Sequence, residues 1–312
     1  MDVICIGSAV IDIMAQPVGD SAEWKEKQRI QTIQIQTGGD AANQSSRLAD
    51  LGLEAAICTC IGSDQNGAML RASLEERGVS TRYIETKEEA STGTALVLVD
   101  GTGERHTFSV KGAHSLLDRE TADCCFDADC RAISLASLFS MPVLERDGLL
   151  EGLRRAKERG ILIFADLASD KLGQGLEGIR SFLPYIDYFL PSLYDAQEMT
   201  GAGSAEEAAH VYLDHGAKNV VVKCGKDGCY FISKEKSGWV PALPVRPVDT
   251  TGAGDCMAAL FISQILEGKD METACRMACA GASYSTLFAG ASGGKISRQM
   301  IYKMDIYGSR KT

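Results

Sequence analysis

The stretch Val248-Asp249-Thr250-Thr251-Gly252-Ala253-Gly254-Asp255 is the most informative segment of this 312-residue sequence. It leads into an apolar run, residues 256–262, which predicts a helix that begins near Ala253. Glycines on both sides of an alanine let a ligand approach the backbone, and the N–H groups of a helix N-terminus attract anions. A carboxylate beside such an anion hole suits phosphoryl transfer, because the amides stabilise the moving group while the carboxylate takes a proton from the acceptor hydroxyl. This chemistry makes Asp255 a candidate catalytic base and the backbone of Gly252, Ala253 and Gly254 a candidate anion hole. A glycine-rich helix entry with an aspartate favoured by the helix dipole is the alternative explanation of the same stretch.

A second stretch, Thr37-Gly38-Gly39-Asp40-Ala41-Ala42-Asn43, opens a helix that we predict over residues 41–51. Asp40 and Asn43 are three residues apart, so both can project from the first helical turn. A carboxylate and an amide suit a ligand with several hydroxyl groups, which needs both donors and acceptors. A simple helix cap, made by the glycines and Asp40, explains the stretch slightly better when it is taken alone.

The remaining sequence alternates between strand and helix patterns, which indicates an α/β fold. Residues 3–6 predict a strand buried on both faces, whereas residues 31–37 alternate polar and apolar side chains like a half-exposed strand. Residues 93–99 and 105–110 predict a hairpin. Further strands are predicted at 55–61, 132–135, 161–165, 188–190 and 219–223, and helices at 66–77, 142–159, 174–182, 204–214, 253–267 and 271–287. Repeated βα units imply a mostly parallel sheet with helices on both faces, and the β-rich pieces could form a small separate sheet.

The composition of the chain excludes some classes of partner. The formal charge of −10 argues against non-specific binding to nucleic acids, which depends on lysine and arginine. The 11 cysteines cannot all form disulfides within the chain, because their number is odd, and they include no C-x-x-C motif. We therefore expect the cysteines to be small core residues of a protein in the reducing cytoplasm. Residues 1–7 predict a first strand and no signal peptide, and no apolar run approaches the ~20 residues of a membrane span. We therefore expect neither a membrane nor a nucleic-acid partner.

Two other nucleotide-binding motifs do not fit. The glycine-rich residues 290–296 have the wrong spacing for a P-loop and end in isoleucine where serine or threonine is required. A dinucleotide-binding motif would need three spaced glycines after the first strand, but residues 7–10 supply only Gly7.

Taken together, residues 249–255 and 38–43 resemble the two signatures of the ribokinase/PfkB family of carbohydrate kinases, in the expected order. The resemblance covers nearly the whole chain. It implies a single ribokinase-like domain over residues 1–312, a three-layer doubly wound mostly parallel sheet, with a discontinuous β lid from about residues 13–37 and 93–112. It also implies phosphorylation of a hydroxyl group on a sugar or sugar derivative by Mg-ATP, in a homodimer formed through the lid. A nucleoside kinase and a non-catalytic nucleotide-binding relative remain alternatives on the same fold.

The resemblance assigns substrate contacts to Asp12, Gly39 and Asn43, and Asp40 adds a carboxylate to this group. Arg105, with His106 and Lys111, lies near the predicted lid hairpin, where these residues could contact an anionic acceptor or form a solvated surface.

The nucleotide-binding loop of the family resembles residues 222–228, which assigns nucleotide contacts to Lys223, Gly225 and Gly228. Many members also bind a monovalent cation such as K⁺, for which Asp249 and Thr251, with carbonyl groups near Gly290, are the matching region.

Two departures from the family pattern concern the ligands. Ser192 and Asp195 stand where the family commonly has Asn-x-x-Glu, so Ser192 would contact the nucleotide and Asp195 would hold Mg²⁺ through water. Residues 135–138 lack the acidic sugar ligand that often follows this strand, which argues against ribose itself as the substrate. Asp166 matches an aspartate common in fructokinase-like members.

Overall fold

Two sheets organise the chain in the computed structural model, which describes residues 1–19, 29–101, 105–291, 293–301 and 303. The larger sheet has nine strands in the order β13-β12-β11-β10-β9-β8-β1-β4-β5. Its neighbouring strands are parallel except at one edge, where β11, β12 and β13 pair antiparallel. The strands are β1 (Val3–Ile6), β4 (Ala55–Gly62), β5 (Ser80–Lys87), β8 (Ala132–Leu138), β9 (Leu162–Leu167), β10 (Tyr188–Phe189), β11 (Asn219–Lys223), β12 (Cys229–Ser233) and β13 (Ser237–Val240).

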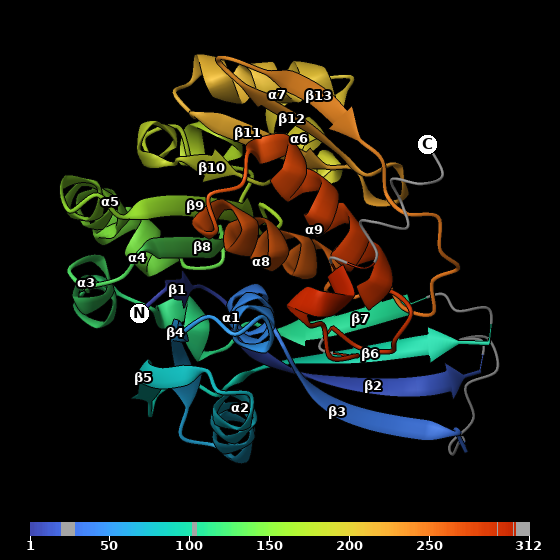
Figure 1. The fold of residues 1–312 in the computed structure, drawn as a ribbon. Helices are drawn as coiled ribbons and strands as arrows, with labels where there is room; N and C mark the ends of the chain where they lie inside the picture. Colours follow the sequence, from blue (N-terminus) through green and yellow to red (C-terminus); the bar gives the residue numbers. More distant parts are fainter. Residues whose placement is uncertain (20–28, 102–104, 292, 302, 304–312) are drawn as a thin grey trace.

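Helices cover both faces of this sheet (Figure 1). The central strand β1 shows why, because Ile4 and Ile6 point into one core while Val3 and Cys5 point into the other. One face carries α3 (Arg119–Phe126), α4 (Pro142–Asp147), α5 (Leu149–Glu158), α6 (Leu193–Thr200) and α7 (Ala205–Asp214). The other face carries α1 (Asp40–Asp50), α2 (Gln65–Glu76), α8 (Ala253–Leu266) and α9 (Met271–Ser285). The predicted three-layer α/β architecture is confirmed.

A separate four-stranded sheet extends from the end of β1, in the order β3-β2-β6-β7 (Figure 1). It consists of β2 (Val10–Val18), β3 (Thr32–Gly38), β6 (Gly93–Asp100) and β7 (Arg105–Val110). We call this sheet the lid. Because β3 leads directly into α1, the lid and the glycines at residues 38–39 are joined without a linker.

Two predicted helices were wrong. The helix predicted over residues 142–159 is divided into α4 and α5 at Gly148, where a Cβ atom would lie 2.7 Å from the Cβ atom of Arg119. Residues 174–182 form only a short 3-10 turn at Gly175–Gly178, because Gly173 and Gly175 adopt positive φ angles that an α-helix does not allow. Within the described part of the chain, no helix is both long enough and apolar enough to cross a bilayer.

Candidate active site

The helix α8 begins where the first signature predicted it, with Gly252 as its N-cap. Gly252 has φ 70°, and a Cβ atom there would lie 2.6 Å from the Cβ atom of Ala291. Only glycine fits this position, where the backbone turns sharply at the start of α8. The Ala253 amide donates a 3.2 Å hydrogen bond to the Thr250 carbonyl, which leaves it less available to an anion than the amides of a free helix N-terminus.

Asp255 lies in the first turn of α8 and is buried. Its carboxylate accepts hydrogen bonds from Asn43 Nδ2 at 2.8 Å and from Gln44 Nε2 at 3.4 Å. Ser134 on β8 in turn donates to Gln44 Oε1 at 2.7 Å, which fixes the amide. Asn43 was predicted to hold substrate; in the structure its side chain is bound to the predicted base.

Burial raises the pKa of Asp255 to about 6. The nearby carboxylate of Asp166 raises this pKa further, while the hydrogen bonds from Asn43 and Gln44 and the charge of Lys223 oppose the increase. A carboxylate with a pKa near neutrality is well suited to accept a proton and release it again.

Lys223, at the end of β11, forms an ion pair with Asp166, at the end of β9. The other oxygen of Asp166 accepts a hydrogen bond from the Leu167 amide at 2.8 Å. Lys223 Nζ also lies 3.5 Å from the position that a Cβ atom on Gly254 would occupy. The ammonium group is therefore placed beside the first turn of α8, at the carboxyl ends of parallel strands where α/β proteins bind ligands.

Asp40 opens α1, and its amide donates a 3.0 Å hydrogen bond to Ser8 Oγ. Burial and the carboxylates of Asp255 and Asp166 hold the pKa of Asp40 well above its usual range, although Lys223 opposes them. The negative charge of Asp195 also raises the pKa of Asp40. The site therefore contains more negative than positive charge.

Ser192 and Asp195, the residues that depart from the family pattern, together form the N-terminus of α6. Ser192 Oγ accepts a hydrogen bond from the Asp195 amide at 3.1 Å and donates one to the Asp195 carboxylate. Ser192 is thus the N-cap of α6, and its hydroxyl bonds to both the amide and the carboxylate of Asp195, so both side chains already have a structural role.

Two cavities of similar size flank this group. The first, which we call the acceptor cavity, has a volume of about 410 Å³ and lies between the lid and the core. Gly39, Asp40 and Asp195 line it, together with residues of β6, β7 and the segments after β8 and β9. The second, which we call the nucleotide cavity, has a volume of about 420 Å³. It is lined by Ser192, Lys223, Gly225, Gly228 and Gly254, and by an apolar wall that includes Leu243, Pro244, Val245 and Ala282.

Asp12 lies on the lid strand β2 and is not among the residues that line the acceptor cavity. Its carboxylate packs so closely over Gly38 that a Cβ atom there would lie 2.1 Å from Oδ2. Burial raises the pKa of Asp12 to about 6. Arg105 begins β7, but its side chain lies outside the described part of the structure.

Asp249 connects the segment before α8 with the loop that follows α9. Its carboxylate accepts hydrogen bonds from the amides of Thr251 and Gly290, both at 2.8 Å. The two residues predicted to bind a monovalent cation are thus adjacent, and Gly290 is close to them as expected.

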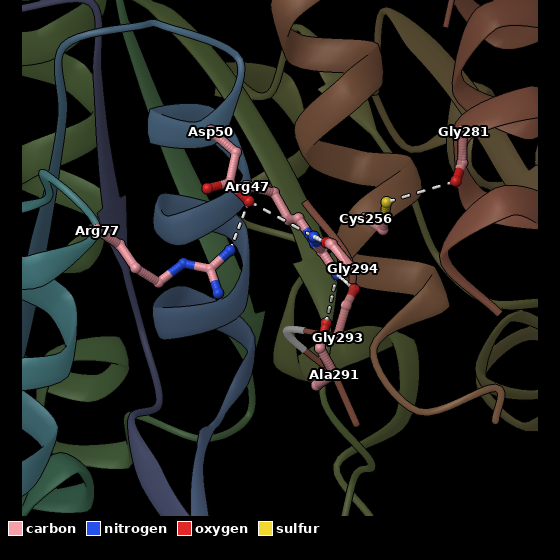
Figure 2. A network of polar contacts seen from close by, with 8 residues as sticks. All are labelled: Arg47, Asp50, Arg77, Cys256, Gly281, Ala291, Gly293 and Gly294. Atoms are coloured by element: carbon pink, nitrogen blue, oxygen red, sulfur yellow. Dashed lines mark hydrogen bonds and ion pairs between the residues drawn. The ribbon is translucent and has the colours of Figure 1, made fainter. Parts of the chain in front are cut away.

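A buried arginine connects α1 to this same loop (Figure 2). Arg47 is only 2% exposed, and it donates hydrogen bonds to the carbonyl groups of Ala291, Gly293 and Gly294 at 3.1, 2.7 and 2.6 Å. Asp50 lies 3.5 Å from the Arg47 guanidinium and also pairs with Arg77. Since Ala291 contacts Gly252, Arg47 helps to fix the position of the loop that supports the anion hole.

Sequence reasoning missed four residues of this region: Gln44, Arg47, His114 and Lys171. Gln44 and Arg47 follow Asn43 on α1 at positions 44 and 47, so the helical period could have placed them on faces near Asn43. His114 and Lys171 line the acceptor cavity from loops, and no local pattern in the sequence marks them.

Comparison with known proteins agrees with the two signatures. The model of the pfkB family carbohydrate kinases matches residues 1–297. The ribokinase of Haemophilus influenzae is 30% identical over 283 residues, which cover 86% of this chain and 87% of that protein. The solved ribokinase of Thermotoga maritima has a TM-score of 0.80 at 26% identity and covers 97% of this chain and 98% of its own. A putative ribokinase II of E. coli, solved with ATP and Mg²⁺, shares the fold with a TM-score of 0.82 at 23% identity, covering 99% of each chain.

The match extends over both signatures, both sheets and nearly all the helices, so the predicted family and fold are confirmed. On these grounds, this protein belongs to the pfkB family of carbohydrate kinases.

Proposed function

We propose that this protein transfers the γ-phosphoryl group of ATP to a hydroxyl group of a sugar or sugar derivative, with Asp255 as the base. The observation that carries the proposal is the buried carboxylate in the first turn of α8, which lines neither cavity itself but is linked to a wall residue of each. It directly follows Gly254, which lines the nucleotide cavity, and its charge acts on Asp40, which lines the acceptor cavity.

In the proposed reaction, ionised Asp255 accepts the proton of the acceptor hydroxyl as its oxygen attacks the γ-phosphorus. The bond between the γ-phosphorus and the bridging oxygen breaks, and ADP leaves. The backbone amides of Gly252, Ala253 and Gly254 and the ammonium of Lys223 stabilise the negative charge on the transferred group. Asp255 then releases its proton to water, which a pKa near 6 permits at neutral pH.

ATP would place its base against the apolar wall of the nucleotide cavity and its phosphates toward Lys223, Gly225 and Gly228. Mg²⁺ would arrive with the nucleotide. Among the described residues, no group of three or more His, Cys, Asp or Glu side chains could hold a metal ion unaided. The residues present nevertheless fit a nucleotide-bound cation. The carboxylates of Asp166 and Asp195 help to raise the pKa of Asp40, that of Asp195 helps to raise the pKa of Asp166, and a divalent charge would relieve this repulsion.

Acceptor binding is assigned to Gly39, Asp40 and Asn43, with Asp12 and Arg105 contributed by the lid. A monovalent cation such as K⁺ would lie near Asp249, Thr251 and the carbonyl groups around Gly290. The buried thiols of the chain, which form no disulfide, fit the reducing cytoplasm that we propose as its location.

We further propose that residues 1–312 act as one kinase domain that forms a homodimer through the outer face of the lid. Cross-strand pairing aligns Ile35, Ile13, Leu96 and Phe108 in one row across the four strands. Three of them, Ile35, Leu96 and Phe108, are exposed by 53%, 38% and 58%. An apolar row of this kind on a sheet surface is typical of an interface. Phe108→Asp should therefore convert a dimer into a monomer in light scattering, whereas a wild-type monomer at micromolar concentration would contradict the proposal.

Turnover of ATP to ADP with Mg²⁺ tests the central proposal on a panel of ketoses, aldoses, sugar acids and nucleosides. At least one acceptor should support turnover, and Asp255→Asn should reduce kcat by about 10³-fold while ATP still binds. Binding of ATP without turnover of any acceptor would support the non-catalytic alternative instead, and turnover of nucleosides alone would support a nucleoside kinase.

A further inference from the structure

We infer that the acceptor carries an anionic group, a carboxylate or a phosphate, which Lys111, His114 and Lys171 bind in the acceptor cavity. This inference rests on the proposed function, because it names the class of acceptor that the same site would phosphorylate. It also separates two roles in the cavity: Asp40 would bind hydroxyl groups near the base, and the basic cluster would hold the charged end of the molecule.

The three basic side chains come from different parts of the fold and meet in one cavity. Lys111 directly follows the lid strand β7, and His114 lies in the 3-10 turn Ala113–Leu116 that leads back to the core. Lys171 belongs to the loop after β9. Both lysines lower the pKa of His114, which shows that the three groups lie within electrostatic range of one another. An anion bound here would therefore be contacted by both the lid and the core.

The two lysines have no carboxylate partner in the described residues, in contrast to Lys223, which is paired with Asp166. Burial raises the pKa of the nearby Glu145 to about 6, and the charge of Lys111 is among the influences that oppose this increase. That carboxylate already accepts hydrogen bonds from the amides of Phe139 and Met141 at 2.7 and 3.1 Å. Glu145 thus supports the cavity wall, and both ammonium groups remain available to a ligand.

His114 supplies a second, independent observation. It is 8% exposed, and its Nδ1 atom has no hydrogen-bond partner in the described structure. Burial, followed by the charges of Lys111 and Lys171, lowers the pKa of His114 to about 4, so the ring is neutral at pH 7. A buried polar atom left without a partner costs about 1–3 kcal/mol, which a ligand or ordered water in the cavity can offset.

The net charge of the chain makes this cluster more informative. A protein with a formal charge of −10 repels anions at long range, so an anionic acceptor needs local cationic groups. Ser109, Ser140 and Ser169 line the same cavity and add hydroxyl donors of the kind that bind carboxylate and phosphate oxygens. A neutral sugar would need the hydroxyl groups alone and would leave two unpaired lysines at its binding site.

Two matched pairs of acceptors test the inference: gluconate against glucose, and fructose 6-phosphate against fructose. Calorimetry without nucleotide measures binding, and coupled ADP release measures turnover. In at least one pair, the anionic member should bind at least about tenfold more tightly than its neutral partner. The pair that responds distinguishes a carboxylate from a phosphate.

The double variant Lys111→Gln/Lys171→Gln should weaken binding of that anion at least about tenfold, while the KM for ATP and the binding of the neutral partner change less than about twofold. Lys234→Gln, which removes an exposed lysine far along the chain on the β12–β13 turn, is the matched control and should change neither value. Equal or tighter binding of both neutral sugars, no binding of either anion, or unchanged affinity for the anion in the double variant would overturn the inference. Because binding is measured without ATP, a failure of the kinase proposal appears separately, as bound anion without ADP release.

Discussion

The two cavities beside Asp255 have almost the same volume but opposite chemistry. The nucleotide cavity has an apolar wall that includes Leu243, Pro244 and Val245, and Lys223 and Lys226 are its charged residues. The acceptor cavity combines two carboxylates with two lysines and a histidine. A planar base gains most of its affinity from burial, whereas a polyhydroxylated molecule must be recognised by hydrogen bonds and charge. The contrast indicates that one side of the site binds by shape and the other by polar complementarity.

Lys223 lines the nucleotide cavity beside the first turn of α8, and we expect its loss to have the largest effect. Lys223→Met removes the ammonium group that we propose stabilises the negative charge on the γ-phosphoryl group. We expect kcat to fall by about 10²- to 10³-fold. Asp166 is 7% exposed and would be left without its partner, so the free energy of unfolding should decrease by about 3–5 kcal/mol. Steady-state kinetics and chemical denaturation measure the two effects.

The double variant Lys223→Met/Asp166→Asn separates these two consequences. It removes the unpaired carboxylate, so most of the lost stability should return while kcat stays low. Recovery of activity together with stability would show that Lys223 acts only through folding. Its ammonium group would then have no part in stabilising the transferred phosphoryl group.

Arg47 tests whether the loop behind the anion hole must be held rigidly. Arg47→Met leaves the carbonyl groups of Ala291, Gly293 and Gly294 without their donor, and this loop contacts Gly252. A small displacement of the anion hole can reduce kcat by about 10²-fold, and we expect a smaller change in either KM. Arg77→Met is the matched comparison, because it removes the other guanidinium group that pairs with Asp50. It should reduce stability and leave kcat nearly unchanged.

Arg47→Lys and added guanidinium refine this test. Lysine keeps the charge but cannot donate to three carbonyl groups in the same planar geometry, so kcat should recover only in part. Low millimolar guanidinium should partly restore Arg47→Met. Equal kcat values in Arg47→Met and Arg77→Met would contradict a positioning role.

Much of the fold could be predicted from local sequence patterns, and the elements that were predicted wrongly or missed have local physical causes. The alternation of β1, β4, β8 and β9 with amphipathic helices is visible because each strand is a short apolar run. β5 was missed because it reads Ser-Thr-Arg-Tyr-Ile-Glu-Thr-Lys, an edge strand that is half exposed and mostly polar. Its strand conformation comes from pairing with β4, which the sequence does not show.

The site shows the same limit. The signatures singled out Asp255, Gly252 and Asn43 because their chemistry is concentrated in short stretches. The hydrogen bond from Asn43 to Asp255 could not be predicted, since it joins residues 212 positions apart. The role of Ser192 as the N-cap of α6 was not recognised, although serine is among the residues preferred at that position.

The pH dependence of turnover measures the electrostatics on the acceptor side. The pKa of Asp255 is raised to about 6, and the base must be ionised. At saturating substrate, kcat should therefore fall below pH 6, by about tenfold at pH 5. Asp40→Asn removes a negative charge near Asp255 and favours its ionised form, so the acidic limb should move to lower pH.

The same carboxylate affects stability with a defined sign. Because the pKa of Asp255 is raised in the folded state, its contribution to stability is greatest below the unfolded pKa of about 3.8 and is lost as the pH rises through about 6.

The kcat profile of Asp40→Asn can contradict the assignment of the acidic limb to Asp255. A limb that does not move in this variant, or that moves to higher pH, would show that it belongs to another group, such as Asp12.

Ala282→Phe changes only the apolar side and should have the smallest effect. Ala282 is half-buried on α9 and lines the nucleotide cavity, where a phenyl ring would occupy space needed by the base. Overpacking of an apolar site costs about 1 kcal/mol or more, which corresponds to an increase of about fivefold in the KM for ATP. The KM for the acceptor should not change, because Ala282 is not among the residues that line the acceptor cavity. Glu198→Phe, an exposed position on α6, adds the same ring outside both cavities and should change neither KM. If Ala282→Phe raised the KM values for both substrates equally, the two cavities would be coupled. The conclusion that one cavity binds by apolar burial and the other by hydrogen bonds and charge would then be wrong.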